Sequence, residues 1–300
     1  MMTRYEIKFR INHEQKTRLL EAARFALRED PHGQDACYRV TSIYYDTKGL
    51  DFYWQRVDGQ PVRRKLRLRF YGEIDNWQEV ALRPCFLELK HRVGESAYKD
   101  RLRLTPEGVQ RILADAAALR DVRDLVAAEH ADQHEALATI EWIHGALGCE
   151  PVNVISYRRE AWIGLVDSRL RLTFDQMAHA YNPDLDTAIG THTGLPVICP
   201  GEYIMEIKFN YAIPRWMREL VGAHGLFPQR FSKYATGVET LRNPTQRQRS
   251  GSFAVGAGFC ALRRYQPAKE RTPVPVLSLD NTAELGDTAV PPADQFLAAE

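Results

Sequence analysis

The amino-acid sequence predicts an α+β protein built around a closed or nearly closed antiparallel β-barrel of about eight strands, with helices packed outside. Charged and apolar residues alternate in several stretches of the chain, which is the pattern of strands with one polar face. These stretches follow one another with few helices between them. A flat sheet would crowd arginines against each other across neighbouring strands, whereas a curled sheet turns the charges into a water-filled tunnel.

The clearest alternation lies in residues 63–71, which read Arg-Arg-Lys-Leu-Arg-Leu-Arg-Phe-Tyr. The period of two puts Lys65, Arg67 and Arg69 on one face and apolar side chains on the other. Taken alone, this stretch also fits an ordinary amphipathic strand whose basic face is solvated. Recurrence favours the tunnel, because the same alternation returns at residues 4–10, 88–92, 99–103, 169–175 and 206–208.

The remaining elements follow from apolar spacing and turn signals. Strands are expected at residues 4–11, 38–45, 52–57, 63–71, 86–92, 98–104, 151–165, 169–174 and 202–209. Helices are expected at residues 13–27, 105–128, 135–147, 214–223 and 231–241. The stretch 178–201 holds few large apolar residues and is expected to be a long mobile loop.

The domain organisation is predicted from a change in composition after Asn243. Residues 1–242 are expected to form the barrel domain. From there the chain is rich in Gln, Arg, Ser, Gly and Pro, which predicts a mostly disordered tail over residues 243–300.

Composition excludes several classes of function. The formal net charge of +1 argues against binding of nucleic acid through bulk positive charge, so any anion site must be local. The five cysteines include no CxxC pair, which fits a reducing cytosol rather than a disulfide framework. We expect a cytoplasmic protein with no integral membrane segment, because no signal peptide and no long apolar run is present.

The inward charges predict an anionic guest. Crowded lysines and arginines repel each other, and phosphate groups would neutralise them. No G-x-x-x-x-G-K-[ST] motif is present, so side chains would have to hold the phosphates. Glu6, Glu88 and Glu206 each precede a lysine at E-x-K spacing, and hard oxygens near phosphate suggest Mg²⁺ or Mn²⁺. Simple ion pairs within the sheet are the alternative explanation of each E-x-K.

A series of short segments resembles the vacuolar transporter chaperone (VTC) or polyphosphate polymerase domain, within the wider triphosphate tunnel metalloenzyme (CYTH-like) group. In family order the segments are RYEIKF (4–9), SIYYDT (42–47), KLRLRFYG (65–72), LELKHR followed by K-x-R (87–101), SYRREA (156–161), LRLTFD (170–175), MEIKF (205–209), PRW (214–216) and RFSKY (230–234). The wider group often opens with E-x-E-x-K. Here Arg4 takes the first position, which suits the VTC branch and leaves one carboxylate fewer to bind a metal ion.

The alternation of charges and the resemblance together give expected roles for individual residues. The expected catalytic residues are Arg67, Arg69, Arg159 and Arg171. The expected phosphate-binding residues are Lys8, Lys65, Lys90, Lys99, Arg101, Lys208, Arg230, Ser232 and Lys233. Glu206 is the expected ligand of Mn²⁺ or Mg²⁺, with Glu88 and Glu6 as further candidates.

The activity that the resemblance implies is metal-dependent transfer of a phosphoryl group from ATP or another triphosphate to orthophosphate or polyphosphate. Two alternatives stay open at this point. An inorganic or organic triphosphatase would use water as the acceptor in the same tunnel. A non-catalytic polyphosphate- or triphosphate-binding module would use the tail to recruit a protein partner.

Overall fold

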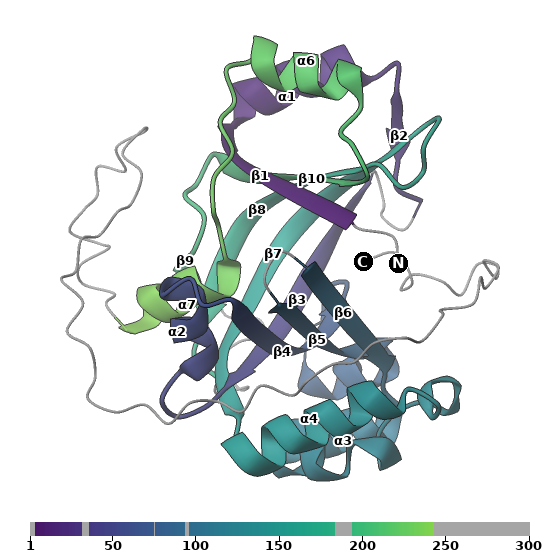
Figure 1. Cartoon of the computed structure of the whole chain (residues 1–300), viewed down its shortest axis with the longest axis vertical. Helices are drawn as coiled ribbons and strands as arrows, with labels where there is room; N and C mark the ends of the chain where they lie inside the picture. The colour runs from purple at the N-terminus through teal and green to yellow at the C-terminus, as the bar shows by residue number, and fades with distance from the viewer. Residues whose placement is uncertain (1–3, 32–35, 75, 94–95, 184–193, 243–300) are drawn as a thin grey trace.

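The computed structural model describes residues 4–31, 36–74, 76–93, 96–183 and 194–242. Its centre is one antiparallel sheet of ten strands (Figure 1). The strands are β1 (Arg4–Asn12), β2 (Leu27–Glu29), β3 (Cys37–Asp46), β4 (Val62–Tyr71), β5 (Cys85–Val93), β6 (Ser96–Arg103), β7 (Glu150–Gly164), β8 (Arg171–Tyr181), β9 (Leu195–Pro196) and β10 (Glu202–Asn210). The main order is β1-β10-β8-β7-β3-β4-β5-β6, while β2 pairs with β7 and β9 pairs with β8.

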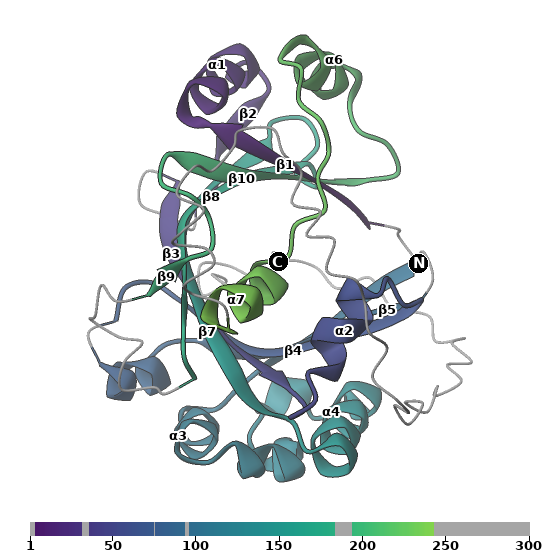
Figure 2. The same ribbon diagram turned by 90° about the vertical axis from the view of Figure 1, so that its left-hand side faces the viewer.

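The sheet curls into a half-barrel that is open on one side, as Figure 2 shows. Its two edges are β1 and β6, and no backbone pairing joins them in the described part of the chain. The predicted fold class, a curled antiparallel sheet with helices around it, is confirmed.

Two apolar cores cover the outer face of the sheet, where the alternation placed them. One core packs α3 (Pro106–Ala114) and α4 (His134–Leu147) against outward residues of β4 to β6 such as Leu66 and Leu87. The other packs α1 (His13–Ala23) and α6 (Arg215–Ala223) against outward residues of β1, β8 and β10 such as Phe9 and Met205. Because these apolar residues face outward, their charged neighbours along each strand must face inward.

A third core lies around α7 (Lys233–Arg242), which Figure 2 shows inside the curl of the sheet, near α2 (Asp51–Val57). Inward residues of β3 and β7, including Tyr44 and Ile155, pack with Tyr234 and Val238 of the helix. At Gly237 the helix approaches the sheet so closely that an added Cβ would lie 2.5 Å from Ile155 Cδ1. Part of the barrel interior is therefore filled by a helix, in contrast to the helices predicted outside.

The predicted strand at 52–57 is wrong, because this segment forms α2. Its aromatic residues favour a strand locally. The Asp46 carboxylate, however, accepts the backbone N–H groups of Phe52 and Tyr53 at 2.9 Å each, which starts a helix here. The tertiary contact with Asp46 therefore outweighs the local preference of these residues for a strand.

Other boundaries also differ from the prediction. The helix predicted over 105–128 ends at Ala114, because the Asp115 backbone is extended, and short 3-10 helices follow at Ala116–Asp124 and Ala128–His130. The helix predicted over 13–27 ends at Ala23, since Leu27 pairs with Gly164. The predicted loop 178–201 includes the end of β8 and all of β9, while residues 184–193 and the tail 243–300 lie outside the described residues.

A matched pair of glycines tests the packing of the outer helices. Gly108→Ala in α3 should destabilise the protein by more than about 1 kcal/mol, because the new Cβ would meet the Leu125 backbone, with its Cα at 2.9 Å. Gly145→Ala in α4 should instead stabilise it by about 0.5–1 kcal/mol, because nothing lies within 4 Å and alanine favours the helix. Chemical denaturation of both variants measures these changes, and equal effects would contradict the packing described.

Candidate active site

The first of two carboxylate clusters inside the barrel is centred on Glu88 of β5, which is fully buried. Arg67 of β4 contacts it through Nε at 2.7 Å and also through Nη2. Lys99 lies at 2.9 Å, Arg101 at 3.5 Å and Arg69 at 3.9 Å. Burial alone would raise the pKa of Glu88, but Arg67 and Arg69 outweigh it and hold the pKa well below its usual value. Glu88 is therefore an ionised counterion shared by several cations.

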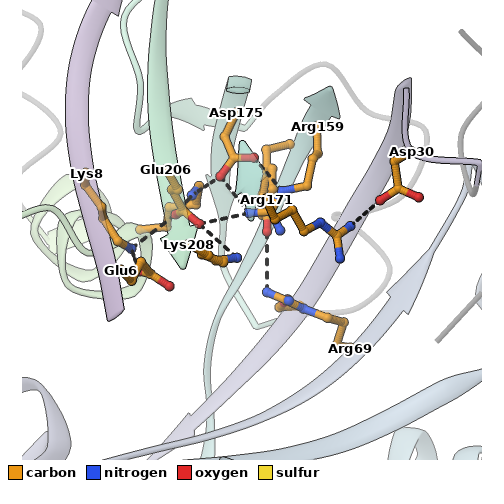
Figure 3. A network of polar contacts seen from close by, with 12 residues as sticks. Glu6, Lys8, Asp30, Arg69, Arg159, Arg171, Asp175, Glu206 and Lys208 are labelled. Atoms are coloured by element: carbon orange, nitrogen blue, oxygen red, sulfur yellow. Dashed lines mark hydrogen bonds and ion pairs between the residues drawn. The ribbon is translucent and has the colours of Figure 1, made fainter. Parts of the chain in front are cut away.

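The second cluster is centred on Glu206 of β10, and Figure 3 shows it from close by. Lys8 lies 3.1 Å from the carboxylate, Lys208 and Lys233 at 3.3 Å, and Arg159 at 3.4 Å. These cations hold the pKa of Glu206 well below its usual value although burial opposes them. The strand register produces this arrangement, because Lys8 of β1 lies directly opposite Glu206.

Asp175 of β8 belongs to the same cluster and was not among the predicted site residues. It is fully buried, and Arg159 forks onto it with Nε at 2.7 Å and Nη2 at 2.9 Å. Lys233 also contacts it and so bridges Asp175 and Glu206. The sequence did hold a signal, since Asp175 lies an even number of residues from Arg171 and so shares its face of the strand.

Two further carboxylates accompany cations of this cluster. Glu6 lies 2.9 Å from Lys8. Burial opposes ionisation of Glu6, yet the Lys8 ammonium lowers its pKa to about 2. Asp30 is buried and lies 2.6 Å from Arg171, as Figure 3 shows. Asp30 follows β2, far from Arg171 in the sequence, and no motif or spacing pointed to this pair.

Positive charge is unevenly distributed over the interior. We use "the β4–β6 wall" for the inward side chains Lys65, Arg67, Arg69, Glu88, Lys90, Lys99 and Arg101, which are six basic side chains and one carboxylate. The opposite side is nearly balanced, with Lys8, Arg159, Arg171, Lys208 and Lys233 beside Glu6, Asp30, Asp175 and Glu206. A polyanion would therefore be attracted most strongly to the β4–β6 wall.

Three lysines stand in one row across this wall. In the strand register Lys65 lies opposite Lys90, and Lys90 lies opposite Lys99. Like charges directly opposite each other destabilise a sheet. Burial and the neighbouring Arg67 lower the pKa of Lys90 to about 7, and burial and Lys8 lower the pKa of Lys65 well below its usual value. Lys90 forms no hydrogen bond or ion pair with a described residue, so it is available to an anion.

Tyrosines that were not predicted orient the central arginines. Arg67 Nη1 donates to the hydroxyl of Tyr44 at 3.1 Å. Arg69 donates to Ser42 at 3.1 Å and to the hydroxyl of Tyr157 at 3.4 Å. These residues occupy inward positions of β3 and β7, but an alternation of charged and apolar residues does not mark tyrosine as polar.

The structure brings most of the predicted site residues together in the two clusters and the lysine row. Ser232 is buried at the start of α7 and accepts a hydrogen bond from Lys65 at 2.9 Å. Arg230 differs from the others, because it is exposed and its charge acts on Arg56 rather than on either cluster.

The donor set fits a metal ion that arrives with a phosphate ligand. No group of three or more His, Cys, Asp or Glu side chains within the described ranges could hold a metal by itself. Glu206 stays ionised, and Mg²⁺-like ions commonly bind through one or two carboxylates and complete their shell with substrate phosphates and water. Glu88 and Glu206 each contact four cations, and Glu88 is the less accessible of the two because its side chain is fully buried.

In a comparison with protein families, the VTC domain matches residues 3–242. The chain belongs to the VTC domain family. Among similar proteins is the vacuolar transporter chaperone complex subunit 4 of Schizosaccharomyces pombe, 27% identical over 236 residues, covering 67% of this chain and 32% of that protein. The subunit of the same name from Trypanosoma brucei brucei is 25% identical over 231 residues, covering 69% and 29%. This VTC-family chain thus spans about a third of the length of the curated relatives it matches.

Solved structures resemble the VTC-family chain more distantly. A Bacillus halodurans protein named as a candidate adenylate cyclase has a TM-score of 0.44 and 14% identity, covering 77% of this chain and 94% of that chain. A candidate adenylyl cyclase from Hippeastrum, described as having a dominant triphosphatase activity, has a TM-score of 0.42 and 16% identity, covering 80% and 95%. In the described part of the VTC-family chain, no helix is both long and apolar enough to cross a membrane.

The lowered pKa of Lys90 predicts proton uptake on binding. At pH 8 a lysine with a pKa of about 7 is mostly neutral, and a bound polyanion favours its charged form. Titration of tripolyphosphate in buffers of different ionisation enthalpy should show protons taken up, and Lys90→Met should reduce the number. Lys48→Met, at an exposed position, should not.

The same shift has a consequence for the empty protein. The pKa of Lys90 in the folded state lies below the unfolded value of 10.5, so its charge disfavours folding below about pH 7. Stability should therefore rise with pH between about 7 and 10.5, and it should rise less in Lys90→Met, which lacks this group. Identical pH profiles of the two proteins would contradict the crowded lysine row.

Arg69 tests whether the β4–β6 wall binds anions. Arg69→Met should weaken tripolyphosphate binding by about 10- to 100-fold, since a hydrogen bond to a charged group contributes about 1.5–3 kcal/mol. Arg24→Met removes the same charge from an exposed position of the surface and controls for general attraction. Equal affinity of the two variants, measured by calorimetry, would place Arg69 outside the binding site.

Proposed function

We propose that this chain transfers the terminal phosphoryl group of ATP or another nucleoside triphosphate to orthophosphate or to the end of a polyphosphate chain. The observation that carries the proposal is the β4–β6 wall, which holds six basic side chains and the single carboxylate Glu88, with four of the six within 4.0 Å of that carboxylate. That excess of charge suits a ligand with many negative charges in a row. Phosphoryl transfer depends mainly on positioning and on neutralisation of charge, which such a wall provides.

The four predicted catalytic arginines are held in fixed orientations. Arg159 is forked onto Asp175, and Arg171 is bound by Asp30 and by the hydroxyl of Tyr38 at 2.9 Å. Arg67 and Arg69 are held by Glu88 and by the tyrosines described above. Guanidinium groups fixed in this way can neutralise charge on the transferred group without rearranging. The predicted lysines, Arg101 and Ser232 would bind the other phosphates.

Mn²⁺ or Mg²⁺, when bound, would supply positive charge that neutralises the phosphate groups. Glu206 is the residue that would hold it, and Glu6 is close enough to share Lys8 with Glu206. Glu88 would instead keep Arg67 and Lys99 in place.

A phosphate acceptor is favoured over water by the state of the carboxylates. The carboxylates Glu88, Asp175 and Glu206 each contact at least two cations. The lowered pKa values of Glu88 and Glu206 make both poor bases for activating water. An ionised phosphate needs no such base. The family supports the same choice, because the resemblance noted above is to a polyphosphate polymerase domain.

Incubation with ATP and Mn²⁺ tests the proposal. We expect phosphate chains longer than that of the nucleotide, resolved by gel electrophoresis. Glu206→Gln should reduce synthesis by at least about 100-fold, since losing one positioned charge commonly costs about 3 kcal/mol of transition-state stabilisation. Glu219→Gln, at an exposed position of α6, should keep it.

Two other outcomes would replace the proposal. Release of orthophosphate from tripolyphosphate without any chain product would identify a triphosphatase. Tight, metal-independent binding of polyphosphate without turnover of any triphosphate would identify a binding module.

A further inference from the structure

Asp46 is a buried carboxylate outside both clusters, and it joins three elements. It ends β3 and is fully buried. Its oxygens accept the backbone N–H groups of Thr47 at 2.7 Å and of Phe52 and Tyr53 at 2.9 Å, and the hydroxyl of Tyr234 donates to Oδ2. It forms no ion pair with any described lysine or arginine. Hydrogen bonds alone therefore hold this carboxylate, and they tie α2 and α7 to the end of β3.

Tyr234 connects this carboxylate to the phosphate site. Its ring stacks on Tyr44 with centroids 5.0 Å apart, and Tyr44 accepts a hydrogen bond from Arg67. The residue before it in α7 is Lys233, which bridges Asp175 and Glu206. A shift of α7 would move Lys233 away from both carboxylates.

The helix α7 packs closely against the inner face of the sheet. The helix shares no backbone ladder with the sheet, so side chains and close packing must place it. An added Cβ at Gly237 would lie 2.5 Å from Ile155 Cδ1 and 3.0 Å from Asn153 Nδ2. Asn153 also donates to the backbone oxygen of Tyr234 at 3.3 Å.

We propose that Asp46 and Tyr234 are positioning residues of the phosphate site, because their hydrogen bond fixes α7 and thereby places Lys233 beside Asp175 and Glu206. The geometric part rests on the contacts above, and the functional part rests on the proposed function. Neither residue is expected to touch a phosphate. Their effect on binding passes through Lys233.

The first test needs no ligand. Tyr234→Phe removes the hydroxyl and keeps the ring that stacks on Tyr44. Lysine acylation followed by mass spectrometry should show Lys233 protected in the wild type and modified several-fold faster in the variant, relative to the exposed Lys48. Tyr45→Phe is the control, because Tyr45 is a buried tyrosine whose hydroxyl bonds to no described residue, and it should leave Lys233 protected. Unchanged protection in Tyr234→Phe would overturn the proposal.

The second test separates positioning from a general loss of structure. Tyr234→Phe should weaken tripolyphosphate binding about tenfold, the effect of one hydrogen bond of roughly 1.4 kcal/mol. In a Lys233→Ala background it should weaken binding no further, since the residue that it positions is gone. Equal losses in both backgrounds would show a merely structural role and overturn the proposal. If the wild type binds no tripolyphosphate, the proposed function fails, and the acylation result alone decides whether Asp46 and Tyr234 place Lys233.

Discussion

Repulsion between like charges inside the curled sheet is the constraint on which the rest of this structure depends. The strand register sets Lys65, Lys90 and Lys99 side by side, and Glu88 is the one carboxylate among the described residues of their wall. Such an interior cannot stabilise the fold by itself. Stability must come from apolar packing, which includes the core around α7 and the outer face, where Leu66, Leu87 and their neighbours are fully buried under the helices. The outer face of these strands therefore supports folding, and the inner face carries the charges that are proposed to bind a ligand.

The two carboxylate clusters have different consequences for the arginines around them. Glu88 is shared by Arg67, Arg69, Lys99 and Arg101, so each cation keeps much of its charge for a ligand. Arg159 is forked onto Asp175, which Lys233 also contacts, and Arg171 is paired with Asp30. These two arginines are more nearly neutralised and more rigid than the cations around Glu88. In the proposed function this suits them to contact the phosphoryl group that is transferred, which stays in one place, rather than the polyphosphate chain, which moves.

The sequence was sufficient to predict which charged residues face inward, because a period of two is a property of each strand alone. It could not predict that 52–57 is helical, since the Asp46 carboxylate that starts the helix belongs to the end of another element. It could not predict Asp30 beside Arg171, because only the folded sheet brings them together across 141 residues. The place of α7 was missed for a related reason. Its surroundings inside the barrel are apolar around Val238 and charged around Lys233, so no single periodicity describes them.

The seam between the edge strands β1 and β6 allows the width of the charged interior to change. These edge strands share no backbone hydrogen bond in the described part of the chain, so their separation can change without breaking the sheet. Repulsion among the inward cations favours a wider seam, and a polyanion bound as in the proposed function would oppose that repulsion. The separation of the two edge strands therefore depends on the charge inside the curled sheet. The width of the seam should therefore depend on ionic strength, because salt screens the repulsion between these cations.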